Sequence, residues 1–184
     1  MGIGRVASML ALSVLVWTAC GGSEESAEAD DTAAMPSAPA PDTTGAAMWA
    51  HIQGVDYRAN WTIWPGKEQF YAGNQPHGML LTTYMNDVAL EAFNAKTGSM
   101  SDGAIVVKEN YMPDSTLAAV TVMYKRSGYN ADHNDWFFAK HLPSGVLDTM
   151  PNGMAMEGRL PGCQNCHVGM KANDYLFTSS LTGN

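Results

Sequence analysis

Three residues near the C-terminus, Cys163, Cys166 and His167, spell the pattern C-x-x-C-H. Two thiols three residues apart on one turn can reach the two vinyl groups along one edge of a haem. The adjacent imidazole can then bind the iron as a neutral nitrogen ligand. The pattern therefore predicts one covalently attached haem c, with thioether bonds to Cys163 and Cys166 and with His167 as the iron ligand.

Three other kinds of site compete for Cys163 and Cys166 in a chain that has only three cysteines. A thioredoxin-type redox pair is expected in a βαβ unit, which the sequence does not indicate. A zinc site needs a fourth ligand, and no partner cysteine pair is present. A disulfide across two intervening residues is uncommon. Haem attachment is favoured over all three.

The second axial position of the iron separates an electron carrier from an enzyme or a gas binder. Met or His at that position raises the potential and blocks small ligands. Met150, Met154 and Met156 lie just ahead of the pattern, but methionine is also a common packing residue. The remaining histidines show no spacing that indicates ligation, and we expect them at the surface or in hydrogen bonds: His51, His77, His133 and His141.

Lys108 lies in the apolar segment 103–112, GAIVVKENYM, whose branched residues predict a strand. Side chains alternate along a strand, so Lys108 shares a face with Ala104 and Val106. A lysine among such neighbours can extend to solvent from an edge strand, pair with a carboxylate such as Asp102, or have a special role. Periodicity alone favours the first of these.

The elements that must position these residues indicate a mainly β, α+β domain with an antiparallel sheet and a few short helices. Apolar, β-forming runs separated by turn residues predict the strands, and helical spacing behind Asn86 or Asp87 predicts a helix that ends at Gly98. A Pro- and Gly-rich loop at 150–162 leads into the C-x-x-C-H pattern. The predicted helices are 46–53 and 88–98, and the predicted strands are 79–85, 103–112, 116–126 and 134–142.

The N-terminus predicts export. Residues 1–19 have one positive charge at Arg5 and a short apolar run, which is typical of a signal peptide rather than of a membrane span. Small residues precede Cys20, so we expect lipidation of Cys20 as in a bacterial lipoprotein. Residues 20–45 are rich in carboxylates, Pro, Ser and Ala, and they are expected to form a disordered acidic tether. The folded domain is therefore expected at 46–184.

The distribution of charge excludes one class of partner. The chain has a net charge of −8, and the tether holds six carboxylates and no Lys or Arg. Subtracting these carboxylates and Arg5 leaves 12 acidic and nine basic side chains in the domain. Because the domain has no basic patch, we expect no nucleic-acid partner.

Four segments together resemble the cytochrome P-460 family, and they occur in the family's order from about Tyr57 to Thr178. The resemblance implies a predominantly antiparallel β fold, a homodimer, and haem c packed against the sheet. Late placement of the C-x-x-C-H pattern is part of the resemblance. The segments are NQPHGMLLTTYMNDVALEAF, DGAIVVKENYMPDSTLAAVTVMYK, NDWFFAKH and GCQNCHVGMKANDYLFT.

The resemblance also implies roles for individual residues. Enzymatic members of the family oxidise hydroxylamine, with nitric oxide chemistry on the path to nitrous oxide, and have a lysine bonded to a haem meso carbon; Lys108 occupies the matching position. Desolvation would lower the pKa of this amine and supply the neutral nitrogen that such a bond requires. Turnover of hydroxylamine also needs a distal proton acceptor; Glu157, six residues ahead of Cys163 in the predicted loop, is the candidate from its position and not from the resemblance, and the alternative is a solvated loop carboxylate. Glu109 is expected to face away from Lys108, and Arg58 is a weaker candidate for a haem propionate or the distal pocket.

Three functions follow as expectations. The first is a haem oxidoreductase that acts on hydroxylamine or nitric oxide, with a Lys108–haem cross-link and a soluble c-type cytochrome as electron acceptor. The second, as in the related cytochromes c′-beta, is a five-coordinate haem protein that binds nitric oxide without turnover. The third is a methionine-ligated electron carrier. In each case we expect a periplasmic or outer-surface location, with the lipid on Cys20 holding the protein at a membrane.

Overall fold

The structure is a computed structural model that describes residues 39–182. The predicted signal peptide, the lipidation site Cys20 and most of the predicted tether lie outside the described residues. Between residues 39 and 182, no helix is long and apolar enough to cross a membrane.

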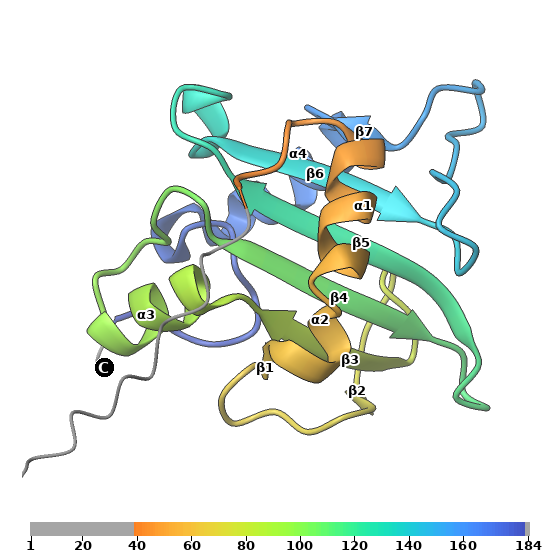
Figure 1. Ribbon diagram of the computed structural model, residues 1–184, viewed down its shortest axis with the longest axis horizontal. Helices are drawn as coiled ribbons and strands as arrows, with labels where there is room; N and C mark the ends of the chain where they lie inside the picture. Colours follow the sequence, from red (N-terminus) through yellow and green to blue (C-terminus); the bar gives the residue numbers. More distant parts are fainter. Residues whose placement is uncertain (1–38, 183–184) are drawn as a thin grey trace, which may run out of the picture. The chain divides into compact units, whose positions relative to one another are not determined.

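A single antiparallel sheet forms the frame of the domain (Figure 1). Its strands follow the order β1-β3-β4-β5-β6-β7, and β2 also pairs with β3. From β3 to β6 each strand pairs antiparallel with the next one along the chain, and a short turn joins β4 to β5. The strands are β1 (Thr62–Ile63), β2 (Tyr71–Ala72), β3 (Leu80–Met85), β4 (Ile105–Tyr111), β5 (Leu117–Lys125), β6 (Trp136–His141) and β7 (Glu157–Gly158).

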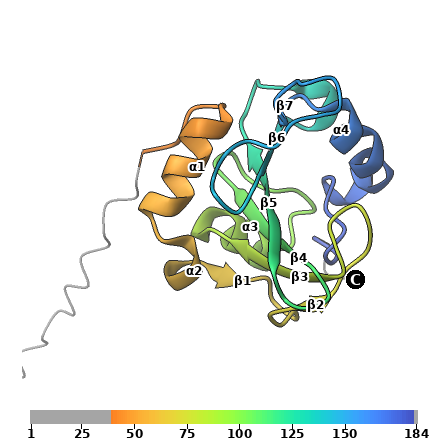
Figure 2. The same cartoon turned by 90° about the vertical axis from the view of Figure 1, so that its right-hand side faces the viewer.

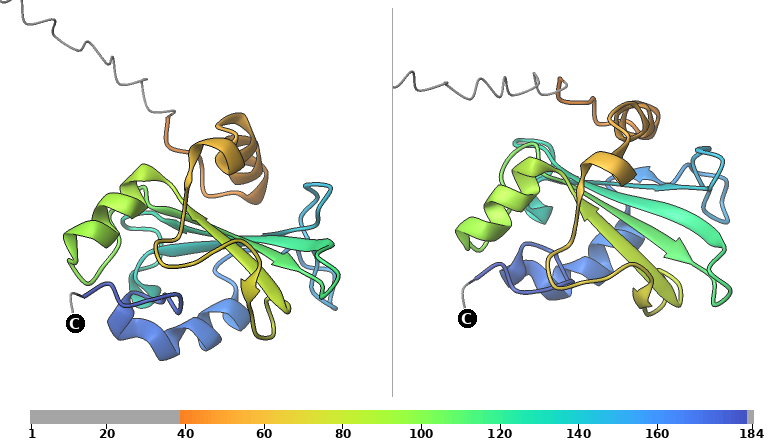
Figure 3. Two further views of the ribbon diagram at one scale, coloured as in Figure 1. Left: turned by 90° about the horizontal axis from the view of Figure 1, so that it is seen from below. Right: turned by 60° about the horizontal axis from the view of Figure 1, so that its bottom comes forward.

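Helices cover both faces of the sheet. Helices α1 (Gly45–Gly54) and α2 (Tyr57–Asn60) lie on one face, and α4 (Pro161–His167) with the turn η2 (Val168–Asn173) lies on the other, as Figures 2 and 3 show. Helix α3 (Asp87–Ala95) connects β3 to β4, and the turn η1 (Ala131–His133) precedes β6. The sheet is therefore the middle layer of three.

Alternation along the strands divides the apolar side chains into two cores. Ile105 and Val107 of β4 pack with α1 in one core, whereas Ala104 and Val106 pack with α3 and the C-terminal segment in the other. Burial on both sides explains why β4 and β5 read as nearly continuous apolar runs. The same alternation places Lys108 on the side of α4 and Glu109 on the side of α1, as predicted.

The long strands and both long helices were predictable, with small shifts at their ends. Asn86 is the N-cap of α3, where its side chain accepts a hydrogen bond from the Ala89 amide at 3.1 Å. The helix ends at Ala95 with Lys96 in the left-handed region, before the predicted end at Gly98. The predicted loop at 150–162 also contains β7, which its pairing with β6 holds in place.

Candidate functional site

Helix α4 brings the two cysteines and the histidine of the C-x-x-C-H pattern onto the sheet. Pro161 occupies the first turn of α4, where its missing N–H is no loss, and His167 is the last helical residue. Cys163 is half-buried, Cys166 is exposed, and both thiols are free. Burial raises the pKa of the Cys163 thiol. Three residues of helix place the two thiols on neighbouring points of one face.

The ring of His167 is held in one orientation. Its exposed fraction is 6%, and Nδ1 lies 2.7 Å from the backbone carbonyl oxygen of Tyr175. Because a carbonyl only accepts, Nδ1 is the protonated nitrogen and Nε2 has the free lone pair. Burial also lowers the pKa of His167, which favours the neutral ring. A neutral imidazole with a free Nε2 is the form that binds a metal.

Aromatic rings surround His167 on several sides. The centroid of its ring lies 5.2 Å from that of Phe177, 5.5 Å from that of Phe138 and 6.1 Å from that of His77, each in an edge-to-face arrangement. Phe138 comes from the sheet, Phe177 from the C-terminal segment and His77 from the loop between β2 and β3. Three separate parts of the chain therefore converge on this imidazole.

A cavity of about 480 Å³ lies between the sheet and the C-terminal segment. Its walls include Lys108 from β4 and Cys163, Cys166 and His167 from α4. A second hollow of about 350 Å³ shares several of these residues, including Lys108 and His167, and so extends the first. The remaining wall is largely apolar; it includes Val106, Met123, Phe138, Met150, Met156 and Leu176.

Lys108 lies in β4, in the part of the cavity wall that the sheet forms. In the registers of β4, β5 and β6, Lys108 lies opposite Thr121 and Thr121 opposite Lys140, so the three side chains form one row across the sheet. Lys140 is paired with Asp148 at 2.8 Å. In the part of the chain that the structure describes, no carboxylate lies within ion-pair distance of Lys108. Burial lowers the pKa of Lys108 to about 8.

The residues around this cavity fit a haem. The volume falls in the range of roughly 300–1,000 Å³ that is typical of cofactor pockets, and the wall is mainly apolar with a few convergent polar groups. The donor set consists of two free thiols on one helical face and a neutral imidazole with its lone pair free. Such a set suits two thioether bonds and one nitrogen–iron bond.

Comparison with known families agrees with this geometry. The family model described as cytochrome P-460 matches residues 56–178, which is more than half of the chain.

The chain belongs to the cytochrome P-460 family.

No curated protein matches the chain. Membership of the cytochrome P-460 family indicates a haem cofactor with its iron, an oxidoreductase kind of activity, and chemistry of the hydroxylamine and nitric oxide type. The match ends at Thr178 and so includes Lys108 and the whole C-x-x-C-H pattern. Four of the predicted site residues thus meet at one cavity inside the matched region: Lys108, Cys163, Cys166 and His167.

Two other predicted site residues lie elsewhere. Glu157 pairs with Ala139 across β7 and β6, and its carboxylate accepts a hydrogen bond from the amide of Gly45 at the start of α1. Arg58 forms an ion pair with Glu109 at 2.5 Å on the same side of the sheet. The expectation that Glu157 or Arg58 faces the haem pocket is therefore corrected: Glu157 is directed to the start of α1, and Arg58 lies in α2 on that same face, where it is bound to Glu109.

His77 is the cavity residue that sequence reasoning missed. Its Nδ1 lies 3.1 Å from Oδ1 of Asn110. The amide nitrogen of Asn110 donates to the carbonyl oxygens of Lys108 and Ala119, which fixes the orientation of the amide. Nδ1 of His77 is therefore the donor, and Nε2 has the free lone pair. Burial, with the charge of Lys108 second, lowers the pKa of His77 to about 4.

The other candidates have ordinary packing or hydrogen-bonding roles. His133 contacts the hydroxyl group of Tyr175 at 3.2 Å, and Nδ1 of His141 contacts the Gly145 carbonyl oxygen at 3.2 Å, as predicted for hydrogen-bonded histidines. Met154 is exposed. Met150 and Met156 line the cavity and also pack against the core beside it.

Proposed function

We propose that this cytochrome P-460 family member is a periplasmic or outer-surface c-type haem oxidoreductase that acts on hydroxylamine, nitric oxide or both, towards nitrous oxide. Cys163 and Cys166 hold the haem, His167 binds its iron through Nε2, and Lys108 forms a third covalent tether. One observation supports the proposal above others: the amine of Lys108 reaches the same cavity as the thiols and the imidazole, without a carboxylate partner. The lipid on Cys20 holds the protein at the membrane, and a soluble c-type cytochrome accepts the electrons.

The environment of Lys108 favours the third tether. A C–N bond from Lys108 to a meso carbon would replace one N–H bond and the C–H bond of that carbon, so its formation would release two protons and two electrons to a two-electron oxidant such as a peroxide. The amine must attack in its neutral form, which burial makes accessible near neutral pH. A carboxylate partner would occupy the amine, as Asp148 does for Lys140. Lys108 has no such partner among the described residues, so its amine is available for bond formation.

When bound, the haem iron supplies the one-electron redox centre. Oxidation of hydroxylamine towards nitrous oxide releases protons and electrons in equal number, so the pocket needs a base. His77 fills the role that the sequence assigned to Glu157: its ring is neutral, its Nε2 lone pair is free, and it lines the same cavity as Lys108. Asn110 holds the ring in the tautomer that can accept a proton.

Three measurements on the purified protein test the proposal. We expect mass spectrometry of the haem peptide to find a covalent link from Lys108 in addition to the thioethers, and the reduced spectrum to differ from that of an ordinary c-type haem. We expect hydroxylamine oxidation with an added electron acceptor. Nitric oxide binding without any turnover would instead assign the protein to the cytochrome c′-beta kind, and a low-spin methionine-ligated spectrum would assign it to electron carriers.

A His77→Gln variant is expected to oxidise hydroxylamine roughly 100-fold more slowly, because positioned proton acceptors contribute about that much or more. Glutamine keeps a donor for Asn110 but offers no basic nitrogen. Haem content and the Lys108 link should stay unchanged. A His51→Gln variant, which alters a histidine of α1 outside the cavity, is the matched control. Unchanged turnover in the His77 variant would remove the proposed base, and a change from a low-spin to a high-spin spectrum would mean that His77 is an iron ligand instead.

A further inference from the structure

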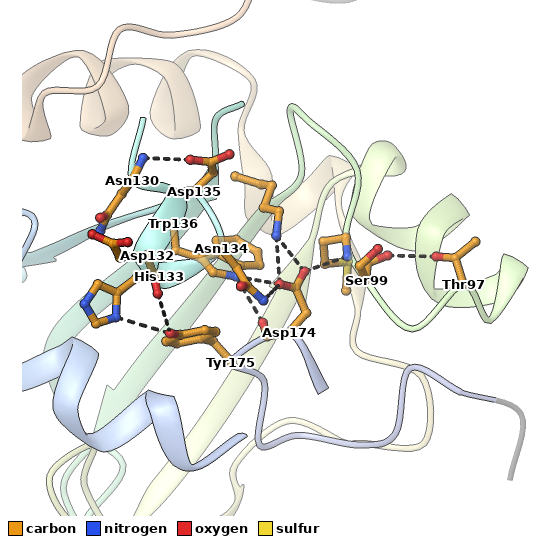
Figure 4. A network of polar contacts seen from close by, with 12 residues as sticks. Thr97, Ser99, Asn130, Asp132, His133, Asn134, Asp135, Trp136, Asp174 and Tyr175 are labelled. Carbon is orange, nitrogen blue, oxygen red and sulfur yellow. Dashed lines mark hydrogen bonds and ion pairs between the residues drawn. The ribbon is translucent and has the colours of Figure 1, made fainter. Parts of the chain in front are cut away.

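Asp174, seven residues after His167, is the most heavily bonded carboxylate near the site, as Figure 4 shows. Its exposed fraction is 1%. The carboxylate accepts from Nζ of Lys125 at 2.7 and 2.9 Å, from Nδ2 of Asn134 at 2.9 Å and from the Met100 amide at 2.7 Å. The indole N–H of Trp136 donates to the backbone oxygen of Asp174 at 3.0 Å. A buried carboxylate with this many donors is rigidly held.

The backbone at this point needs such support. Asp174 has φ 50° and Tyr175 has φ 67°, so two consecutive non-glycine residues lie in the left-handed region. Each costs roughly 1–2 kcal/mol relative to ordinary backbone conformations. The two residues reverse the chain after η2 and return it towards α4. The bonds to the Asp174 carboxylate, from β5, the turn before β6 and the loop before β4, offset this cost.

The reversal delivers one functional group to the site. The carbonyl oxygen of Tyr175 is the acceptor for Nδ1 of His167, at 2.7 Å. The phenol of Tyr175 is held at its other end, 3.2 Å from Nδ1 of His133 and 3.4 Å from the backbone oxygen of Asp132. The carbonyl can therefore neither rotate nor recede without breaking bonds on both sides.

We propose that Asp174 is a positioning residue for the haem iron: it fixes the Tyr175 carbonyl in line with Nδ1 of His167 and so strengthens electron donation by Nε2. A strong hydrogen bond from Nδ1 makes an imidazole a more basic ligand, and hydrogen bonding around a haem ligand is one of the ways in which a protein sets the potential. A more basic ligand stabilises the ferric state. The proposal rests on His167 as iron ligand, which is part of the proposed function, and not on any particular substrate.

An Asp174→Asn variant tests this role. Asparagine keeps the size of the side chain but presents an N–H group to donors, so the turn loosens and the Nδ1 hydrogen bond weakens. The holoprotein is expected to show a higher midpoint potential than the unsubstituted protein and a lower iron–histidine stretching frequency in the ferrous state. An Asp102→Asn variant, which removes the exposed ion pair with Arg126 (3.3 Å), is the control and should change neither quantity.

A second variant guards against simple misfolding. Lys125 is 13% exposed and would lose its partner in Asp174→Asn, so a Lys125→Met/Asp174→Asn double variant removes the unpaired charge. The same shifts in potential and stretching frequency are expected. Unchanged values in a folded variant, or loss of the fold in both variants, would reduce Asp174 to a structural role. Neither measurement needs turnover, so a failure to oxidise hydroxylamine would defeat the proposed function and leave this comparison intact.

Discussion

A Lys108→Met variant is expected to keep its haem but to lose the third covalent tether, and with it hydroxylamine oxidation by roughly 100-fold or more, the usual effect of removing a group that acts at the reacting centre. Methionine has similar length and no nucleophilic nitrogen, so packing against Val106 and Thr121 should persist. Mass spectrometry of the haem peptide and turnover with an electron acceptor measure the two effects.

A Lys140→Met variant is the matched control for Lys108. Both lysines line the cavity and flank Thr121 in one row of the sheet, but Lys140 already has Asp148 as its partner. The control should retain the extra mass on the haem peptide and most of the turnover. If both variants behave alike, the distinction between a free and a paired amine has no role in the chemistry.

The Lys108→Met substitution should also stabilise the apoprotein near pH 7. The folded-state pKa of Lys108 is about 8, below the value of 10.5 for a free lysine. The protonated amine therefore opposes folding fully below pH 8, and this cost disappears as the pH rises from 8 to 10.5. We expect Lys108→Met to unfold at higher urea concentration at pH 7, with a free energy of unfolding larger by about 3 kcal/mol, and we expect this difference to vanish above pH 10.5. A difference in the free energy of unfolding that stays constant between pH 7 and pH 10.5 would contradict the lowered pKa of Lys108.

The largest loss of stability is expected on the opposite face, in a Glu109→Leu variant. Glu109 is 1% exposed and accepts hydrogen bonds from the hydroxyl groups of Tyr57 at 2.7 Å and Tyr111 at 2.5 Å, besides its ion pair with Arg58. Burial, followed by the bond to Glu109, raises the pKa of both phenols, which keeps them as donors. Leucine would leave these groups without an acceptor, at a cost of about 3–5 kcal/mol.

Urea unfolding of the holoprotein measures this loss. An Asp148→Asn variant removes the ion pair with Lys140, whose partners are both partly exposed, and it should cost no more than about 1 kcal/mol. Glu109→Gln keeps one acceptor and is expected to fall between the two. A Glu109→Leu variant no less stable than the Asp148 variant would show that the buried cluster is not a major source of stability.

Sequence alone predicted the parts of the fold whose signals are local. Nearly continuous runs of branched and other apolar residues marked β4 and β5, and Asn86 marked the start of α3. The two-residue strands β1, β2 and β7 have no pattern of their own, because pairing with longer neighbours creates them. Their existence is a tertiary effect, which no window of the sequence contains.

The candidate site was likewise predictable only where its sequence signals are local. The spacing of Cys163, Cys166 and His167 was visible, and the pleat placed Lys108 on the correct face. Glu157 was chosen for its closeness in sequence to Cys163, but its pairing with Ala139 of β6 directs the carboxylate to α1. His77 was missed because only the fold of the β2–β3 loop and the side chain of Asn110 bring it to the cavity.

The C-terminal segment both closes the core beside the cavity and contains the residues proposed to bind the haem. Leu160, Tyr175, Leu176 and Leu181 are fully buried in the core beside the cavity, within the same stretch as the cysteines and His167. A cofactor bound to this stretch adds its binding energy to core closure. We expect the apoprotein to open there more often than the haem-bound protein and therefore to be cleaved there faster by proteases. Such cleavage would separate His167 from the rest of the domain together with the side chains that close this core.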